Sequence, residues 1–225
     1  MKIIAHIQND FPTKFGVPRQ SGLIPEARSR IIFEKEYRVP EAFRGLEGYS
    51  HLWLLWEFHQ AKRESWSPTV RPPRLGGNKR MGVFATRSPF RPNPIGLSCV
   101  KLEEILQDEK LGPVLIVSGA DLMDGTPLYD IKPYLPYADC KTDATGGFAA
   151  DVMGHALQVN FPEDLLSLIP QEQKETLLSV LSQDPRPGYQ QDPERIYGFP
   201  YGDFEIRFRV AEEILTVLEV EKNHP

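Results

Sequence analysis

Short runs of apolar residues, each bounded by turn-forming residues, dominate the first 137 positions of this 225-residue chain. No segment there keeps a helical spacing of apolar residues over ten or more positions. Gly, Pro, Asn and Asp separate the runs, as they do between the strands of all-β proteins. The runs are 2–8, 30–37, 51–58, 81–86, 97–105 and 113–122. We therefore predict a mainly β domain, folded as an antiparallel barrel or sandwich.

The run HLWLLWEF at 51–58 is apolar on both faces, so we expect it to pass through the middle of the core. His59 and Gln60 follow it directly and precede a basic loop. A lone histidine at a strand end is more often structural than functional. Loops held by a buried strand nevertheless carry many functional sites, so both residues are candidates.

The remainder of the chain has a different pattern. Residues 138–150, ADCKTDATGGFAA, are small and polar, which is typical of a junction between domains. The segments that follow are predicted as a strand at 152–161, a helix at 172–182, and two strands at 204–210 and 214–221. We predict a β-barrel domain over 1–140 and a small α+β subdomain over 141–225 that ends in a hairpin.

The net charge of −5 conceals an uneven distribution of charged residues. Residues 1–102 hold 17 Lys and Arg against 8 Asp and Glu, a balance of +9. Residues 103–225 hold 9 against 23, a balance of −14, and the two sum to −5. A basic half joined to an acidic half favours binding of a polyanion by the first, while the acidic residues mostly serve solubility.

The basic residues are concentrated in one stretch. No Asp or Glu occurs from Ser65 to Leu102, and Gly and Pro are dense between them. Proline fixes φ and glycine permits close approach, so this stretch is predicted to be a stiff, irregular loop that presents cations to an anion. Its cations are Arg71, Arg74, Lys79, Arg80, Arg87, Arg91 and Lys101.

Two further segments combine turn residues with polar side chains. Arg19 and Gln20 lie in FGVPRQSG, which is either a ligand contact or a surface turn. The segment DGTP at 124–127 is either part of a site or a plain hairpin connection. Asp130 and Tyr134 follow in an extended stretch whose mixture of groups suits the wall of a polar pocket.

Several classes of protein lack support in this sequence. It has no Rossmann glycine motif, no phosphate-binding P-loop, no zincin motif and no nucleophile elbow. The five histidines lack metal-ligand spacing, and Cys99 and Cys140 are isolated, so we expect no metal and no disulfide framework. No apolar run is long enough for a transmembrane helix and no signal peptide is evident, so a cytoplasmic protein is expected.

Taken together, the motifs resemble a known family. PRQSG, SHLWLLWEFHQ, RPPRLGG, GVFATRSPFRPNPIG and DLMDGTPLYDIKPY are similar to those of the tRNA threonylcarbamoyladenosine N6-methyltransferases. The resemblance implies an S-adenosylmethionine-dependent enzyme built on a β-barrel, and a homodimer with cofactor sites near the subunit interface. It also implies methyl transfer to N6 of the modified adenosine that lies 3′ of the tRNA anticodon.

The resemblance also assigns a cofactor site, residue by residue. The S-adenosylmethionine contacts of the family would fall on Pro18, Arg19, Gln20, His59, Gln60, Arg87, Leu97, Asp124, Gly125, Thr126 and Pro127. The acceptor N6 must lose a proton, so a general base is expected, and Asp130, His59 or a water assisted by Tyr134 are the alternatives. Arg87 and Arg91 suit the cofactor carboxylate, the threonyl carboxylate or phosphates equally well.

An anticodon loop is single-stranded, so cations along its backbone and aromatic rings under its bases are expected to bind it. Candidate phosphate contacts are Arg71, Arg74, Lys79, Arg80 and Arg91, and candidate stacking residues are Trp66, Phe90 and Tyr134. The same basic loops would also serve a non-catalytic β-barrel module that binds RNA or an adenosyl ligand. The polar pocket made by PRQ, HQ and DGTP favours the enzyme, because a pure RNA-binding module would not need it.

Overall fold

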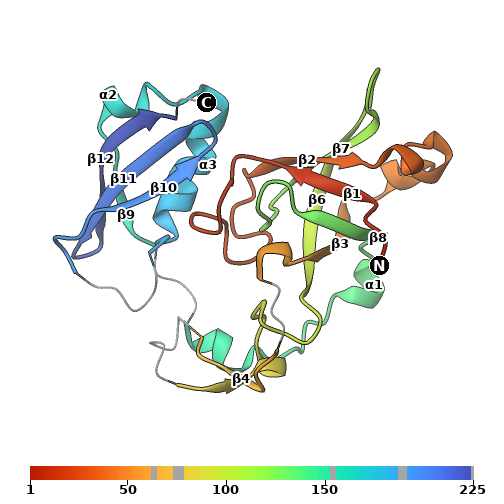
Figure 1. The fold of residues 1–225 in the computed structure, drawn as a ribbon, viewed down its shortest axis with the longest axis horizontal. Helices are drawn as coiled ribbons and strands as arrows, with labels where there is room; N and C mark the ends of the chain where they lie inside the picture. Colours follow the sequence, from red (N-terminus) through yellow and green to blue (C-terminus); the bar gives the residue numbers. More distant parts are fainter. Residues whose placement is uncertain (62–64, 73–78, 153–155, 187–191, 224–225) are drawn as a thin grey trace.

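The computed structural model describes residues 1–61, 65–72, 79–152, 156–186 and 192–223. It contains a closed barrel, a separate four-stranded sheet and a two-stranded ribbon. Figure 1 shows the barrel beside the second sheet, whose strands are blue. The predicted phosphate contact Arg74 and part of the predicted strand 152–161 lie outside the described residues.

Six antiparallel strands close the barrel in the order β1-β2-β7-β6-β3-β8. Their bounds are β1 Ala5–Gln8, β2 Arg28–Phe33, β3 His51–Glu57, β6 Ile95–Asp108, β7 Gly112–Ser118 and β8 Pro127–Pro133. The 14-residue strand β6 pairs with β3 along its first half and with β7 along its second. One long strand therefore serves two neighbours, and the predicted barrel is confirmed.

Alternation along β3 fills the barrel interior. Leu52, Leu54 and Trp56 are buried and belong to the barrel core, while Trp53 and Leu55 between them are only partly buried. We expected residues 51–58 to pass through the middle of the core. In the single chain only the inner face of this strand is fully buried. Trp53 and Leu55 lie on the outer face of the barrel, where their pleat position directs them.

Between the long strands lie short elements, most of them single 3-10 turns. They are η1 Lys35–Tyr37, η2 Pro40–Phe43, η3 Leu46–Gly48, η4 His59–Ala61, β4 Thr69–Val70, β5 Met81–Gly82, η6 Val83–Ala85, α1 Pro136–Asp139 and η7 Gly147–Val152. The prediction of a strand over 81–86 is wrong after residue 82, where β5 ends and η6 begins. Thr86 donates both its backbone N–H and its hydroxyl to Val83 O, which closes a turn there.

The C-terminal sheet has the strand order β10-β11-β12-β9, with β9 parallel to β12. Its elements are β9 Gln158–Asn160, α2 Glu163–Leu166, α3 Gln171–Ser182, β10 Tyr197–Tyr201, β11 Phe204–Ala211 and β12 Ile214–Lys222. The predicted helix and terminal hairpin are present, whereas β10 and α2 were not predicted. Leu177 and Leu181 of α3 pack with Phe199, Phe208 and Leu215 of the sheet.

The segment between β1 and β2 joins the two bodies. Phe11, Ile24 and Ala27 belong to the core of the C-terminal subdomain, although the chain places them between two barrel strands. Gln173 of α3 donates to Asp10 Oδ1 at 2.9 Å. In Figure 1 this red to orange segment lies between the barrel and the blue sheet. The N-terminal part thus supplies part of the second core.

Strand directions bring three connections to the same end of the barrel. The pairs Glu57 with Ile95, His6 with Pro127, and Arg28 with Ser118 place the ends of these strands together. The connections at this end are therefore 9–27, 58–94 and 119–126. These are the three segments that carry the PRQ, HQ with the basic stretch, and DGTP motifs.

Candidate functional site

A wide cleft of about 2040 Å³ lies at this end of the barrel. Residues of 14–23 and 57–94 form most of it, and 145–149 together with Pro185 and Arg186 close it from the C-terminal side. Pockets for drug-sized ligands span roughly 300–1,000 Å³. The cleft is thus large enough for a nucleoside-sized molecule together with part of a polymer.

The described lining of the cleft is strongly cationic. It includes seven Lys and Arg side chains, Lys14, Arg19, Arg71, Arg80, Arg87, Arg91 and Arg186, against a single acid, Glu57. Such a surface attracts and concentrates anionic ligands. Of the predicted cations, Arg71, Arg80, Arg87 and Arg91 line the cleft. Lys79 is exposed and does not line it, Lys101 on β6 pairs with Glu103 instead, and Arg74 lies outside the described residues.

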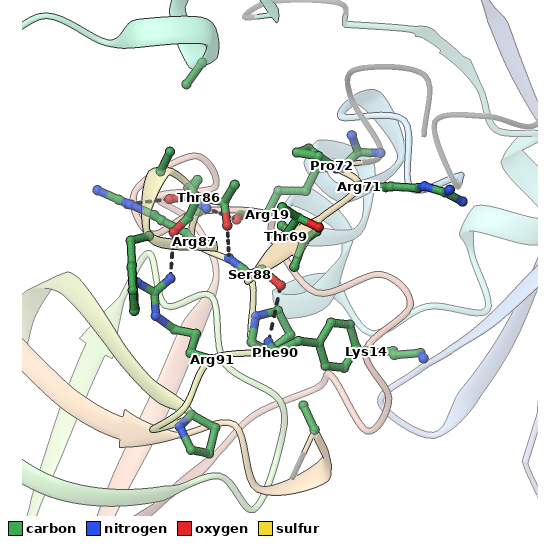
Figure 2. Close-up of a pocket in the computed structure, with 18 of the residues that line it drawn as sticks. Lys14, Arg19, Thr69, Arg71, Pro72, Thr86, Arg87, Ser88, Phe90 and Arg91 are labelled. Atoms are coloured by element: carbon green, nitrogen blue, oxygen red, sulfur yellow. Dashed lines mark hydrogen bonds between the residues drawn. The ribbon is translucent and has the colours of Figure 1, made fainter. Parts of the chain in front are cut away.

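A hydrogen-bonded turn over 86–91 forms one wall. Ser88 N donates to Thr86 Oγ1 at 3.2 Å and Phe90 N to Ser88 Oγ at 3.3 Å. Arg91 Nη1 donates to Thr86 O at 2.6 Å. Figure 2 shows these bonds along the turn, with Arg87 extending from it. Arg91 therefore holds the turn in shape and still lines the cleft.

Gln20 connects the PRQ motif to this turn. Arg87 Nη1 donates to Gln20 Oε1, and Gln20 Nε2 donates to Arg19 O. Two side chains predicted to bind the cofactor, from segments 67 positions apart, are thus in direct contact. Both residues line the cleft.

Arg19 contacts the C-terminal subdomain. Its Nη2 donates to Asp184 O at 2.6 Å and to Arg186 O at 3.0 Å. The carboxylate of Asp184 in turn accepts two hydrogen bonds from Arg186, from Nε at 2.8 Å and from Nη2 at 2.9 Å. This pairing raises the pKa of Arg186. The DPRP turn therefore fixes the PRQ motif to the second subdomain.

Two exposed aromatic rings stand at the mouth of the cleft. Phe84 is 73% exposed and Trp66 is 51% exposed, and their ring centroids are 6.1 Å apart. The Arg91 guanidinium lies 6.0 Å from the Phe84 ring. Trp66 was among the predicted stacking residues and Phe90 also lines the cleft, but Phe84 was missed. Its position inside the acid-free stretch 65–102 could have identified Phe84 as a candidate for RNA binding.

The other predicted cofactor contacts lie around the same barrel end without lining the cleft. Pro18 is buried, and His59 with Gln60 forms the turn η4 directly after β3. Leu97 is 55% exposed on the outer face of β6. These residues thus surround the end of the barrel on several sides.

The DGTP segment forms the tight connection into β8. Asp124 Oδ1 accepts the N–H of Asn9 at 2.9 Å, Gly125 has a φ of +71°, and Thr126 is 2% exposed. Asp124 and Gly125 border a second, shallow hollow of about 270 Å³ beside His6. In the single chain, DGTP therefore serves as the turn that leads into β8.

The three predicted bases do not lie together. Asp130 pairs with Lys132 at 2.9 Å on β8. Tyr134 packs against His51 and Trp53 at the start of β3, which is the end of the barrel opposite the cleft. His59 alone is on a connection at the cleft end.

Two acidic groups near the cleft were missed by sequence reasoning. Glu57 ends β3 and lines the cleft. Burial, together with a hydrogen bond to Glu57, raises the pKa of Tyr129 to about 12. Asp121, in SGADLMDG, lies behind the cleft where burial raises its pKa, although Ser98 and Arg87 oppose the shift. Neither residue occurs in a spacing that signals a site.

Two further properties concern the described part of the chain. No group of three or more His, Cys, Asp or Glu side chains there could hold a metal ion. None of the helices in the described ranges is both long and apolar enough to cross a membrane.

Comparison with known proteins identifies the family. The profile described as the tRNA-methyltransferase O N-terminal domain matches residues 6–140, and that of the TrmO C-terminal domain matches 154–223. The two together cover most of the chain. The chain belongs to the tRNA-methyltransferase O family. This confirms the resemblance found in the sequence and, with it, the prediction that the chain is a methyltransferase.

Relatives within the tRNA-methyltransferase O family match along almost the whole chain. A protein of Escherichia coli K12 named tRNA (adenine(37)-N6)-methyltransferase is 44% identical over 97% of this chain and 96% of its own length. A Pseudomonas aeruginosa protein named putative S-adenosylmethionine-dependent methyltransferase RcsF is 41% identical over 96% and 95%. A crystal structure of TrmO from P. aeruginosa superposes with a TM-score of 0.78 at 37% identity, covering 98% of this chain and 95% of that one.

The cleft draws on both matched regions of this tRNA-methyltransferase O family member. Most of its lining lies within 6–140, while Pro185 and Arg186 lie within 154–223. Residues 145–149 lie between the two regions and also reach the cleft. A site shared in this way depends on how the two subdomains are joined.

Proposed function

We propose that this family member methylates N6 of threonylcarbamoyladenosine at position 37 of tRNA, with S-adenosylmethionine as methyl donor. The observation that carries the proposal is the cationic cleft in which Gln20 of the PRQ motif meets Arg87 of the ATRSPF motif. The names of full-length relatives, which specify the adenine at position 37 and S-adenosylmethionine, support it.

The donor groups of the cleft fit the proposed cofactor. A guanidinium such as Arg87 suits the carboxylate of an amino acid, and amide and hydroxyl groups such as Gln20 and Ser88 suit ribose hydroxyls. We propose that these residues hold the cofactor, together with Pro18, Arg19, His59, Gln60, Leu97 and the 124–127 turn. S-adenosylmethionine supplies an activated methyl group when bound. The chain has to orient the acceptor, a contribution worth roughly 7–11 kcal/mol in well-aligned systems.

For the proton on N6, the geometry supports His59 as the base. It lies on a connection at the cleft end, whereas Asp130 is paired with Lys132 and Tyr134 lies at the far end of the barrel in the same chain. Histidine is the side chain that most often serves as a general base in enzymes. We therefore favour His59 over the other two.

We propose that the anticodon loop lies along the cationic side of the cleft. Arg71, Arg80 and Arg91 would contact its phosphates, and Trp66, Phe84 and Phe90 would stack on bases. Lys79 and Arg74 are further candidates from the same basic stretch of the sequence. The long cationic lining and the exposed rings support this arrangement.

We further propose a homodimer that works in the cytoplasm. The outer face of β3 and β6 supports dimerisation, because Ile95 is 37% exposed and Leu97 is 55% exposed there, beside Trp53 and Leu55. Pairing through this face would place Leu97 of each subunit at the interface. We also propose that 1–140 and 141–225 are the two structural units.

Transfer of a labelled methyl group tests the proposal. Purified protein and labelled S-adenosylmethionine are incubated with tRNA from cells that carry the threonylcarbamoyl modification and with tRNA from cells that lack it. The proposal predicts label only in the modified tRNA. Label in neither pool, with tRNA still bound, would instead favour a non-catalytic RNA-binding module.

A further inference from the structure

Asp121 links two of the three connections at the cleft end of the barrel. It lies in the connection between β7 and β8 and does not line the cleft. Its carboxylate accepts hydrogen bonds from the Ser98 hydroxyl of β6 and from the backbone N–H groups of Ser21 and Asp121 itself, and it faces the charge of Arg87. One side chain thus bonds to the barrel wall and the PRQ segment, and it lies within electrostatic range of Arg87 in the basic stretch.

The barrel side of this connection is rigid. Trp56 Nε1 donates to Ser98 Oγ at 2.9 Å, and Ser98 Oγ donates to Asp121 Oδ1 at 2.5 Å. Trp56 and Ser98 are both buried. Gly96 makes room for the indole, because a Cβ there would lie 2.2 Å from Trp56 Cε2. The carboxylate is therefore held from beneath by a packed tryptophan and a buried hydroxyl.

The cleft side lies next to residues predicted to bind the cofactor. Cys99 N donates to Ser21 Oγ at 3.2 Å, which ties the PRQ segment to β6 a second time. Arg87 reaches Gln20 while its charge also faces Asp121. Fixing Asp121 therefore fixes the backbone after Gln20, and with it the Gln20 side chain that accepts a hydrogen bond from Arg87.

A carboxylate is a costly choice for a purely structural connection. Burial raises the pKa of Asp121, which means that the folded chain disfavours its charged form. An amide could accept a hydrogen bond from Ser98 without that cost. A charged carboxylate attracts a guanidinium more strongly than an amide does, so the charge would help to hold Arg87 in place.

We propose that Asp121 is a positioning residue that holds the PRQ segment and Arg87 in the arrangement that binds S-adenosylmethionine. The proposal rests on the proposed function for its ligand, but the contacts that it invokes are present in the free chain. Asp121 acts through Arg87 and the Ser21 backbone, not by contact with the methyl donor.

The test compares Asp121→Asn and Ser98→Ala with the control Asp108→Asn. Asp108 accepts the N–H groups of Lys110 and Leu111 in the hairpin at the opposite barrel end. Three properties are measured for each protein without tRNA: the S-adenosylmethionine Kd by calorimetry, the Tm, and amide exchange at residues 19–22 and 86–88. We expect Asp121→Asn to raise Kd about tenfold, because hydrogen bonds to charged groups contribute that much.

The remaining measurements separate positioning from simple support of the fold. We expect the Tm of Asp121→Asn to equal or exceed that of the wild type, amide exchange at 19–22 and 86–88 to quicken, and Ser98→Ala to shift Kd in the same direction by less. An unchanged Kd, or a Tm that falls in parallel with affinity, would overturn the proposal. A wild type that binds no S-adenosylmethionine would refute the proposed function and the ligand assigned here, while the exchange data would still decide whether Asp121 holds the two segments.

Discussion

Phe84 and Trp66 show how single side chains could hold an unpaired base at the cleft. Both rings are exposed, they are tilted by 30° to each other, and Arg91 lies near Phe84. Stacking of a base on an aromatic ring contributes about 1–3 kcal/mol by substitution. Replacing Phe84 by Leu should therefore weaken tRNA binding about five- to 100-fold and leave S-adenosylmethionine affinity unchanged.

A titration with fluorescent tRNA measures this loss. Tyr49→Leu is the matched control, because Tyr49 is a 39% exposed aromatic residue at the other end of the barrel. An equal loss in both variants, or none in Phe84→Leu, would remove Phe84 from the RNA site.

Asp121 should also give the chain a measurable dependence of stability on pH. Its folded pKa lies above the ordinary value of 3.8, so the folded state binds a proton more readily than the unfolded state. Its contribution to stability therefore grows as pH falls through the raised pKa toward 3.8, and diminishes as pH rises. Arg87 is the charged side chain that opposes this shift.

Thermal melts of wild type and Asp121→Asn from about pH 4, near the ordinary pKa of 3.8, up to about pH 8 measure the difference. The Asn variant should have its largest advantage in Tm at neutral pH, and that advantage should shrink on acidification. A difference that is constant with pH would show that Asp121 does not titrate as described. Because Asp10 is present in both proteins, its own raised pKa cancels.

Among the structural elements, the DPRP turn after α3 acts on the cleft through Arg19. Replacing Arg19 by Met removes the two hydrogen bonds to Asp184 O and Arg186 O. Bonds from a charged donor contribute about 1.5–3 kcal/mol, so the turn should open more often. Amide exchange at residues 183, 184 and 186 should rise, with Arg28→Met on β2 as the control; residue 185 is a proline and has no N–H. Unchanged exchange there would show that the turn holds itself without Arg19.

Elements with strong local patterns could be predicted from the sequence. Alternation identified β11 and β12, and helical spacing with an acidic start identified α3. The run 81–86 alternates equally well, yet a turn forms there because Thr86 bonds to Val83 O. The local sequence pattern does not show whether a residue bonds within a turn or pairs with a distant strand.

The sequence predicted many of the residues that form the site, but few of the contacts between them. The absence of acids over 65–102 located the cations, and the family motifs located Gln20 and Arg87. The roles of Asp121 and Phe84 depend on contacts between segments far apart in the chain. The contact of Ser21 with Cys99 spans 78 positions, and no spacing rule could suggest it.

On the scale of the whole molecule, the uneven charge becomes a single cationic cleft between two subdomains. Each phosphate that a Lys or Arg neutralises releases counterions, so log affinity falls with log salt at a slope of about −0.7 per contact for single strands. We expect tRNA affinity to fall steeply between low and physiological salt. Arg71→Ala and Arg80→Ala should each reduce the slope by about that amount. A flat response would exclude this cleft as the RNA site.

The three connections at one end of the barrel form the proposed cofactor site. Ultraviolet crosslinking of labelled S-adenosylmethionine, followed by peptide mapping, tests this most directly. We predict label on peptides from 9–27, 58–94 or 119–126, and its loss in Arg87→Ala. Label confined to the C-terminal sheet after residue 196 would contradict the account.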